Sequence, residues 1–229
     1  MILDKRADLG HGDVKKLLFS LSVPTITSQI VNMLYNLVDR VFIGHMQPAE
    51  TVGKLALTGV GVCLPIIMVI SAFASLMAIG GAPRASIAEG AGESEKSERI
   101  MGNCLTMLVI TALVLTVLFE SFAEPLLLMF GASENTIGYA LDYMRIYALG
   151  TIFVQLTLGM NAYITAQGFA TVSMKTVLIG ALLNTALDPL FIFVLGLGVR
   201  GAALATVISQ AVSAVWVMTF LTGKKLSLI

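Results

Sequence analysis

Six apolar stretches, each long enough to cross a lipid bilayer as a helix, constrain the fold of this chain more than any other feature. A helix needs about 20 predominantly apolar residues to span a hydrocarbon core of about 30 Å. The stretches lie approximately at Leu17–Gly44, Leu55–Ala82, Ile100–Phe119, Thr136–Thr165, Thr176–Leu195 and Gly201–Thr222. Since lipid offers backbone groups no hydrogen-bond partners, the pattern predicts an all-α membrane protein, a six-transmembrane-helix bundle.

Composition and charge agree with a membrane protein. The chain is 57% hydrophobic and only 12% charged, a balance that a water-soluble domain of 229 residues could hardly hide from solvent. The charged residues crowd into short stretches between the apolar runs, and nothing in their pattern favours a nucleic-acid partner. Cys63 and Cys104 lack the spacing of metal ligands, so we expect both to pack as small apolar residues.

The positions of Lys and Arg predict how the chain is oriented in the membrane. With the N-terminus inside, most basic residues fall in cytoplasmic segments, whereas the opposite loops contain only Lys54 and Arg200. Positive residues are retained on the cytoplasmic side, so we expect both termini there, in a plasma (inner) membrane. The expected organisation is a cytoplasmic N-terminal segment (1–16), a transmembrane lobe (17–222) and the start of a cytoplasmic linker (223–229).

Prolines and glycines predict the local breaks. The first two apolar stretches exceed the minimum spanning length, and Pro24 and Pro65 are their expected kink positions. The apolar patch Leu126–Phe130 is too short to span, and we expect it to form an interfacial turn. Gly196–Gly201 fits the GxGxxG pattern of nucleotide sites, but it follows a helix-length run and predicts a tight hairpin instead. No nucleophile–base motif is present, so an enzyme is not expected.

Ionisable residues inside the spans are the candidates for function, because each costs about 2.5–3.5 kcal/mol at a helix centre on insertion scales. Asp142 and Arg145 are three residues apart on one helix, and we expect them to pair with each other. Asp188 has no basic residue within reach along its own helix. Pro189 follows it at once, and the missing N–H of this proline frees a backbone carbonyl one turn earlier. Asp188 is therefore the strongest single candidate.

Three other residues reach the level of Asp188 under this topology. Asn184 precedes Asp188 by four residues and shares its helix face. Asp39 lies about five residues from the outer end of the first helix, Asp188 about seven from the outer end of the fifth, and Thr206 about five inside the sixth, which places them within roughly one helical turn at 1.5 Å per residue. If these helices meet, the oxygens of all four side chains suit a hard cation or a proton. Alternatively, the amide simply hydrogen-bonds the carboxylate so that both can be buried.

Polar residues also form a stripe along the first helix. Gln29, Asn32, Asn36 and Asp39 recur at spacings of three, four and three, which places them on one helix face. In lipid this face must look inward, either onto a water-filled cavity or onto other helices as hydrogen-bonding contacts. Tyr35, four residues before Asp39, is placed to hydrogen-bond that carboxylate.

Three separated segments resemble the multidrug and toxic compound extrusion (MATE) transporters. They are NLVDRVFIG at the end of the first helix, NTALDP in the fifth and GAALAT at the start of the sixth, at 36–44, 184–189 and 201–206. The segment 130–134 is similar too, so the resemblance spans nearly the whole chain. It implies an antiporter that exports cationic or amphipathic molecules in exchange for Na⁺ or H⁺.

The resemblance also implies roles for residues. Asp39, Asn184, Asp188 and Thr206 match the positions that bind the coupling Na⁺ or proton in the N-terminal lobe, and we expect Gln29, Asn32, Tyr35 and Asn36 to line the substrate cavity. No cofactor beyond the coupling ion is expected.

Length is where this chain departs from the family. Family members have two six-helix lobes, so the chain is expected to be a half transporter, embedded in membrane lipid, that needs a second lobe. The alternatives are a lipid-linked oligosaccharide flippase of the same superfamily and a membrane subunit that does not transport.

Overall fold

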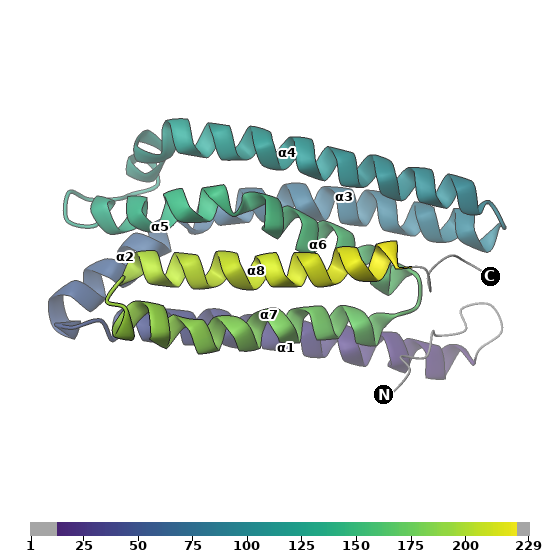
Figure 1. Ribbon diagram of the computed structural model, residues 1–229, viewed down its shortest axis with the longest axis horizontal. Helices are drawn as coiled ribbons and strands as arrows, with labels where there is room; N and C mark the ends of the chain where they lie inside the picture. Colours follow the sequence, from purple (N-terminus) through teal and green to yellow (C-terminus); the bar gives the residue numbers. More distant parts are fainter. Residues whose placement is uncertain (1–12, 224–229) are drawn as a thin grey trace.

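The computed structural model describes residues 13–223 as a bundle of helices joined by short turns (Figure 1). Most of the predicted N-terminal segment 1–16 and linker 223–229 lies outside the described residues. The elements in chain order are α1 (Val14–Gly44), the π-helical turn η1 (Ala49–Gly53), α2 (Lys54–Val62), α3 (Leu64–Gly90), α4 (Ser94–Met129), α5 (Ile137–Leu149), α6 (Thr151–Ala166), α7 (Ala170–Pro189), the π-helical turn η2 (Leu190–Val194) and α8 (Val199–Thr222).

The predicted membrane fold is confirmed. Five segments are long and apolar enough to cross a bilayer, and these are Val14–Gly44, Ala49–Gly90, Ser94–Met129, Ala170–Val194 and Val199–Thr222. The sixth span is the pair α5 and α6, which passes the same test together but bends by 57° at Gly150. The chain is therefore a multi-pass, all-α membrane protein.

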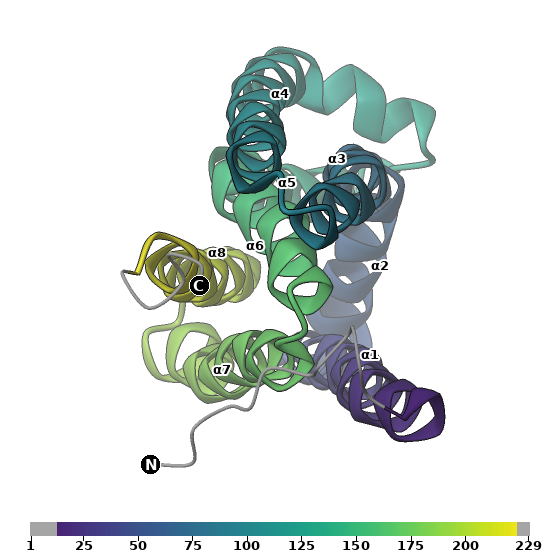
Figure 2. The ribbon, with the colours of Figure 1, turned by 90° about the vertical axis from the view of Figure 1, so that its right-hand side faces the viewer.

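Helix α6 lies inside the bundle and packs against α3, α4, α7 and α8 (Figure 2). Helix α1 packs along α7, and α7 packs along α8. Two apolar clusters form the core. One surrounds Tyr143, Met144 and Ile66, and the other surrounds Met160 and Tyr163. The outer faces of α1 and α4 remain apolar and exposed, as expected for surfaces that lipid covers.

Six of the ten described basic residues belong to segments near one end of the bundle, and these are Lys15, Lys16, Arg84, Lys96, Arg99 and Lys175. The start of α1, the turns after α3 and α6, and the end of α8 all lie at this end (Figure 1). Lys54 and Arg200 lie at the opposite end, beside the turns that follow α1 and η2. Among the described residues, the uneven distribution of Lys and Arg along the sequence is therefore also an uneven distribution between the two ends of the bundle.

One local prediction is wrong. The patch Leu126–Phe130 does not form an interfacial turn, because α4 continues as a helix through Pro125 to Met129. Phe122 absorbs the disturbance with φ −119° and ψ 20°, outside the helical range. A proline ring clashes with the carbonyl four residues earlier, here Ser121, so a distortion next to that residue lets the helix resume.

Pro24 and Pro65 have different positions in their spans. Pro24 lies inside the continuous helix α1. The second span is interrupted at Cys63, and Pro65 then lies in the first turn of α3, where its missing N–H leaves no helical bond unmade.

The predicted hairpin between the last two spans is present. Gly196 and Gly198 have φ of 65° and 56°, a region that residues with a Cβ rarely adopt. A Cβ at Gly201 would lie 2.7 Å from the backbone carbonyl carbon of Phe191. The missing side chain at Gly201 therefore lets the start of α8 pack directly on η2, which fixes how α7 and α8 approach each other.

Candidate cation site and adjoining pocket

Asp188 lies at the end of α7 and is fully buried, with 0% of its surface exposed. Its Oδ1 accepts a hydrogen bond from Asn184 Nδ2 at 3.2 Å, across one turn of the same helix. The other carboxyl oxygen, Oδ2, is buried without a partner. Pro189 next to it cannot donate to the carbonyl of Thr185. A buried carboxylate with a free oxygen is costly unless it binds a proton or a cation.

Asn184 connects α7 with α8. Its Nδ2 also donates to Thr206 Oγ1 at 3.4 Å, and only 2% of the residue is exposed. Both donors of the amide are used on protein acceptors, which leaves Asn184 Oδ1 buried and without a partner. The amide group therefore adds an unpartnered amide oxygen next to the residue whose carboxylate it bonds.

Asp39 of α1 completes the group. It is 8% exposed, and its carboxyl group is a direct neighbour of the Asp188 carboxyl group. Asp39 Oδ1 is a further buried oxygen without a partner. Arg40 is close enough to interact with Asp39 electrostatically. The structure thus brings the four predicted residues Asp39, Asn184, Asp188 and Thr206 together where α1, α7 and α8 meet.

Two tyrosine side chains and one glutamine side chain lie beside this cluster. Tyr143 of α5 is buried, and its hydroxyl adjoins the Thr206 side chain and lies near Asp39. Tyr35 of α1 lies near both carboxyl groups and adjoins the side chain of Gln210 in α8. Sequence reasoning missed Tyr143 and Gln210. Tyr143 lies six residues after the start of α5, so the same depth comparison that grouped the other residues could have included it.

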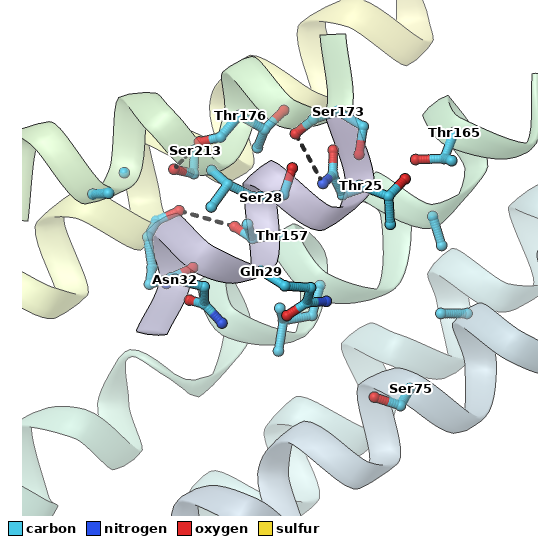
Figure 3. A pocket seen from close by; sticks show the side chains of 18 of the residues that line it. Thr25, Ser28, Gln29, Asn32, Ser75, Thr157, Thr165, Ser173, Thr176 and Ser213 are labelled. Atoms are coloured by element: carbon cyan, nitrogen blue, oxygen red, sulfur yellow. Dashed lines mark hydrogen bonds between the residues drawn. The ribbon is translucent and has the colours of Figure 1, made fainter. Parts of the chain in front are cut away.

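A pocket of about 770 Å³ adjoins the cluster between α1, α3, α6, α7 and α8 (Figure 3). Asn184 and Thr206 of the cluster belong to its lining, and so do Tyr35 and Gln210 beside the cluster. Hydroxyl and amide side chains dominate the polar part of the lining, and the apolar part consists mostly of small residues. The cluster and the pocket are therefore continuous.

Only part of the predicted polar stripe of α1 lines this pocket. Gln29 and Asn32 line it together with Tyr35. Asn36 is exposed and lies outside the lining, and its Nδ2 donates to the Asn32 carbonyl at 2.7 Å on the same helix. Asn36 lies on the same helix face, but it is one turn, about 6 Å, beyond Asn32 along α1 and its amide bonds its own helix.

The predicted Asp142–Arg145 pair is wrong. Asp142 Oδ1 instead accepts from Arg200 Nη2 at 2.8 Å, across the interface between α5 and α8. Helix α8 packs against α5, which brings Arg200 in its first turn within reach of Asp142, whereas Arg145 is exposed. This pair is largely exposed and does not belong to the cation cluster.

The family model described as MatE matches residues 24–190. Among curated proteins, the multidrug export protein MepA of Staphylococcus haemolyticus is 29% identical over 214 residues, which is 93% of this chain and 46% of that protein. MepA of Staphylococcus aureus is 25% identical over 207 residues, covering 90% of this chain and 45% of that protein. The chain thus spans about half the length of the curated relatives it matches.

Solved structures agree in fold. The crystal structure of a MATE protein in the bent conformation superimposes with a TM-score of 0.85 at 28% identity, covering 94% of this chain and 47% of that one. A transporter of the MOP superfamily from Pyrococcus furiosus, whose binding pocket is described as having reverse polarity, gives a TM-score of 0.86 at 28% identity. It covers 95% of this chain and 47% of its own.

Proposed function

This chain belongs to the MatE family, and from that premise we propose that it forms one six-helix lobe of an antiporter that exports small molecules in exchange for Na⁺ or H⁺. On this proposal it is a transporter and not an enzyme, and it works with a second six-helix lobe. The observation that carries the proposal is the buried pair Asp39 and Asp188, which shares Asn184, Thr206 and Tyr35 with a pocket of substrate size.

The chemistry of the cluster suits a coupling ion. Two carboxylates that are neighbours in a dry site cannot both carry a charge cheaply, and either a proton or Na⁺ relieves their repulsion. The unpartnered oxygens of Asp39, Asn184 and Asp188 are the hard ligands that Na⁺ prefers. The residues present therefore fit a monovalent cation as well as a proton.

Coupling follows from the shared side chains. When the ion leaves, Asn184 and the carboxylates rearrange, and the pocket wall that they form changes with them. Pro24 in α1 is a suitable hinge for this change, because it cannot donate the helical bond to the carbonyl of Ser20. The substrate-bound form and the ion-bound form are then alternative states of one cavity.

Orientation is part of the proposal. The end of the bundle that holds the start of α1 and the end of α8 faces the cytoplasm, because six of the ten described basic residues belong to segments near that end (Figure 1). The cation cluster then lies in the outer half of the membrane. Cysteine labelling with a membrane-impermeant reagent at Lys96→Cys, in the first turn of α4, tests this directly, and labelling from outside intact cells would contradict it.

The coupling role is tested by Asp188→Asn in the full-length transporter. We expect efflux of a cationic dye driven by a Na⁺ or proton gradient to fall to background, while the protein still inserts. Unchanged efflux would contradict the role of Asp188. An oligosaccharide flippase fits less well, because none of the described residues lining the pocket is Lys or Arg to bind a lipid pyrophosphate.

A further inference from the structure

Arg145 is an exposed cation on a membrane-spanning segment, and the proposed function gives it no role. It lies on α5, which together with α6 forms the bent sixth span. Within the described residues 13–223, no acidic side chain forms an ion pair with it and no acceptor bonds its guanidinium group. Ionisable residues inside spans are rare and mark the place of a partner, so Arg145 requires a partner that these residues do not supply.

The position of Arg145 brings its guanidinium group toward the membrane surface. The neighbouring ion pair of Asp142 and Arg200 is partly exposed and lies at the outer end of the proposed orientation. Arg145 follows Asp142 by three residues, which places its Cα about 4.5 Å deeper. Side chains tilt toward the start of their helix, and α5 starts at the outer end (Figure 1). The Arg145 side chain therefore points back toward that surface, as arginines near a bilayer surface do.

Glu120 of α4 does not neutralise Arg145, although the two residues lie at a similar depth. Thr116 Oγ1 donates to the Ala148 carbonyl at 2.9 Å, which sets the register of the antiparallel helices α4 and α5. One turn outward on each helix leads to Glu120 and to the residue before Arg145. Helix α4 starts at the inner end, so the Glu120 side chain tilts inward while the Arg145 side chain tilts outward. The two charged groups therefore point away from each other.

Apolar side chains cover the surface beneath Arg145. Leu149, one turn deeper on α5, is 65% exposed, and Val117 and Leu113 of α4 are 66% and 60% exposed. Val117 and Leu149 directly follow the two residues of the hydrogen bond between the helices, so they lie at one level. The pocket takes its walls from other helices and uses none of these residues. Arg145, Leu149, Val117 and Leu113 form what we call the α4–α5 face, which is cationic near the surface and apolar below.

We propose that the α4–α5 face binds a membrane phospholipid, with the lipid phosphate on Arg145 and an acyl chain along Leu149 and Val117. The planar guanidinium fork matches two phosphate oxygens and donates two charge-assisted hydrogen bonds to them. Acyl chains run from the phosphate toward the middle of the bilayer, which is the order in which this face changes from charged to apolar. A water-soluble anion would use the arginine but not the apolar residues beneath it. The binding goes beyond the proposed transport and does not depend on it.

A tryptophan placed on this face reports the binding. Leu149→Trp puts an indole one turn from Arg145, and Trp216→Phe removes the single native tryptophan. The purified protein in detergent is titrated with a phosphatidylethanolamine whose acyl chains carry bromine, because bromine quenches the fluorescence of a tryptophan that it contacts. The matched ligand is the diacylglycerol with the same brominated chains and no phosphate.

The expected result is a preference for phosphate that depends on Arg145. The phospholipid should quench at a concentration at least about tenfold lower than the diacylglycerol, as expected for hydrogen bonds to a charged group. Arg145→Gln should abolish this difference, and Arg145→Lys, which keeps the charge but loses the fork, should reduce it by about threefold. Arg99→Gln changes an exposed arginine at the other end of α4 and should leave the difference intact.

Three results would overturn the proposal. The first is a phospholipid titration that Arg145→Gln leaves unchanged. The second is an equal effect of Arg145→Gln on a reporter placed by Val215→Trp, on an exposed part of α8 that is 65% accessible, since this would indicate general lipid uptake. The third is displacement of the phospholipid by excess inorganic phosphate, which would assign Arg145 to a free anion instead of a lipid.

Discussion

Asp188→Asn should make the chain more stable when Na⁺ is absent and the pH is high, although it alters a fully buried residue. In the native protein, Asp188 Oδ2 and Asp39 Oδ1 are neighbouring acceptors without donors. An asparagine at 188 can keep its oxygen as the acceptor for Asn184, which lies at 3.2 Å, and turn its new amide nitrogen toward Asp39. The substitution thus replaces a repulsive contact by a hydrogen bond.

The size of the effect follows from that exchange. A hydrogen bond to a charged group contributes about 1.5–3 kcal/mol, so the variant should gain about that much in Na⁺-free buffer. The native chain should recover a similar amount when Na⁺ binds, about 2.7 kcal/mol at a concentration 100 times the dissociation constant. Lowering the pH should also stabilise the native chain, because protonating one carboxyl group removes the repulsion, and it should affect the variant less.

Thermal unfolding in detergent measures this. Cys63 is fully buried, so a thiol-reactive fluorogenic dye reports the loss of the core around it. All samples are heated at one rate, because unfolding of such proteins is often irreversible. Asp142→Asn is the matched control, since it removes the same charge from an exposed ion pair outside the cluster. The reasoning would be refuted if Asp188→Asn were less stable than the native chain in Na⁺-free buffer. It would also be refuted if Na⁺ stabilised Asp188→Asn as much as it stabilises the native chain.

Two further substitutions test neighbouring features. Thr206→Val keeps the shape of the side chain but removes the hydroxyl that accepts from Asn184 at 3.4 Å. We expect the stabilisation by Na⁺ to weaken by about 0.5–1.5 kcal/mol in the same unfolding assay. An unchanged stabilisation by Na⁺ would show that the hydroxyl has no role in ion binding. Gly201→Ala should destabilise by about 1–3 kcal/mol because its Cβ would lie 2.7 Å from Phe191. Gly102→Ala, in α4 with open space around it, should be neutral or stabilising by up to about 1 kcal/mol, and equal effects of the two changes would contradict the packing argument.

The spans and the depth of the cluster could be predicted because lipid and helix geometry leave few alternatives. A bilayer requires apolar runs of fixed length, and a helix rises by a constant amount per residue. Counting inward from the ends of three runs was therefore enough to place Asp39, Asp188 and Thr206 at one level. Counting does not say how far along a helix a cavity extends, and Asn36, which shares its helix face with Gln29 and Asn32, lies outside the lining.

Ion pairs between helices could not be predicted either, because the sequence does not show which helices pack together. Spacing along one helix favoured Asp142 with Arg145, since residues three apart are neighbours. Arg200 is 58 residues away in the chain and becomes the partner only because α5 packs on α8. Proximity in sequence is a weak guide when long side chains at a helix end can reach the next helix.

The break between α5 and α6 shows most clearly what tertiary contact adds. Gly150 lies in an apolar run, where glycine is common in membrane helices and gives no signal of a bend. In the structure a Cβ at Gly150 would collide with Val207 of α8, so the missing side chain lets the junction of α5 and α6 pack closely against α8. The 57° bend lets α5 bring Tyr143 to the carboxylates while α6 aims Thr157 and Asn161 into the pocket. One broken span therefore contributes to both the cation cluster and the pocket, and a straight helix through Gly150 could not serve both.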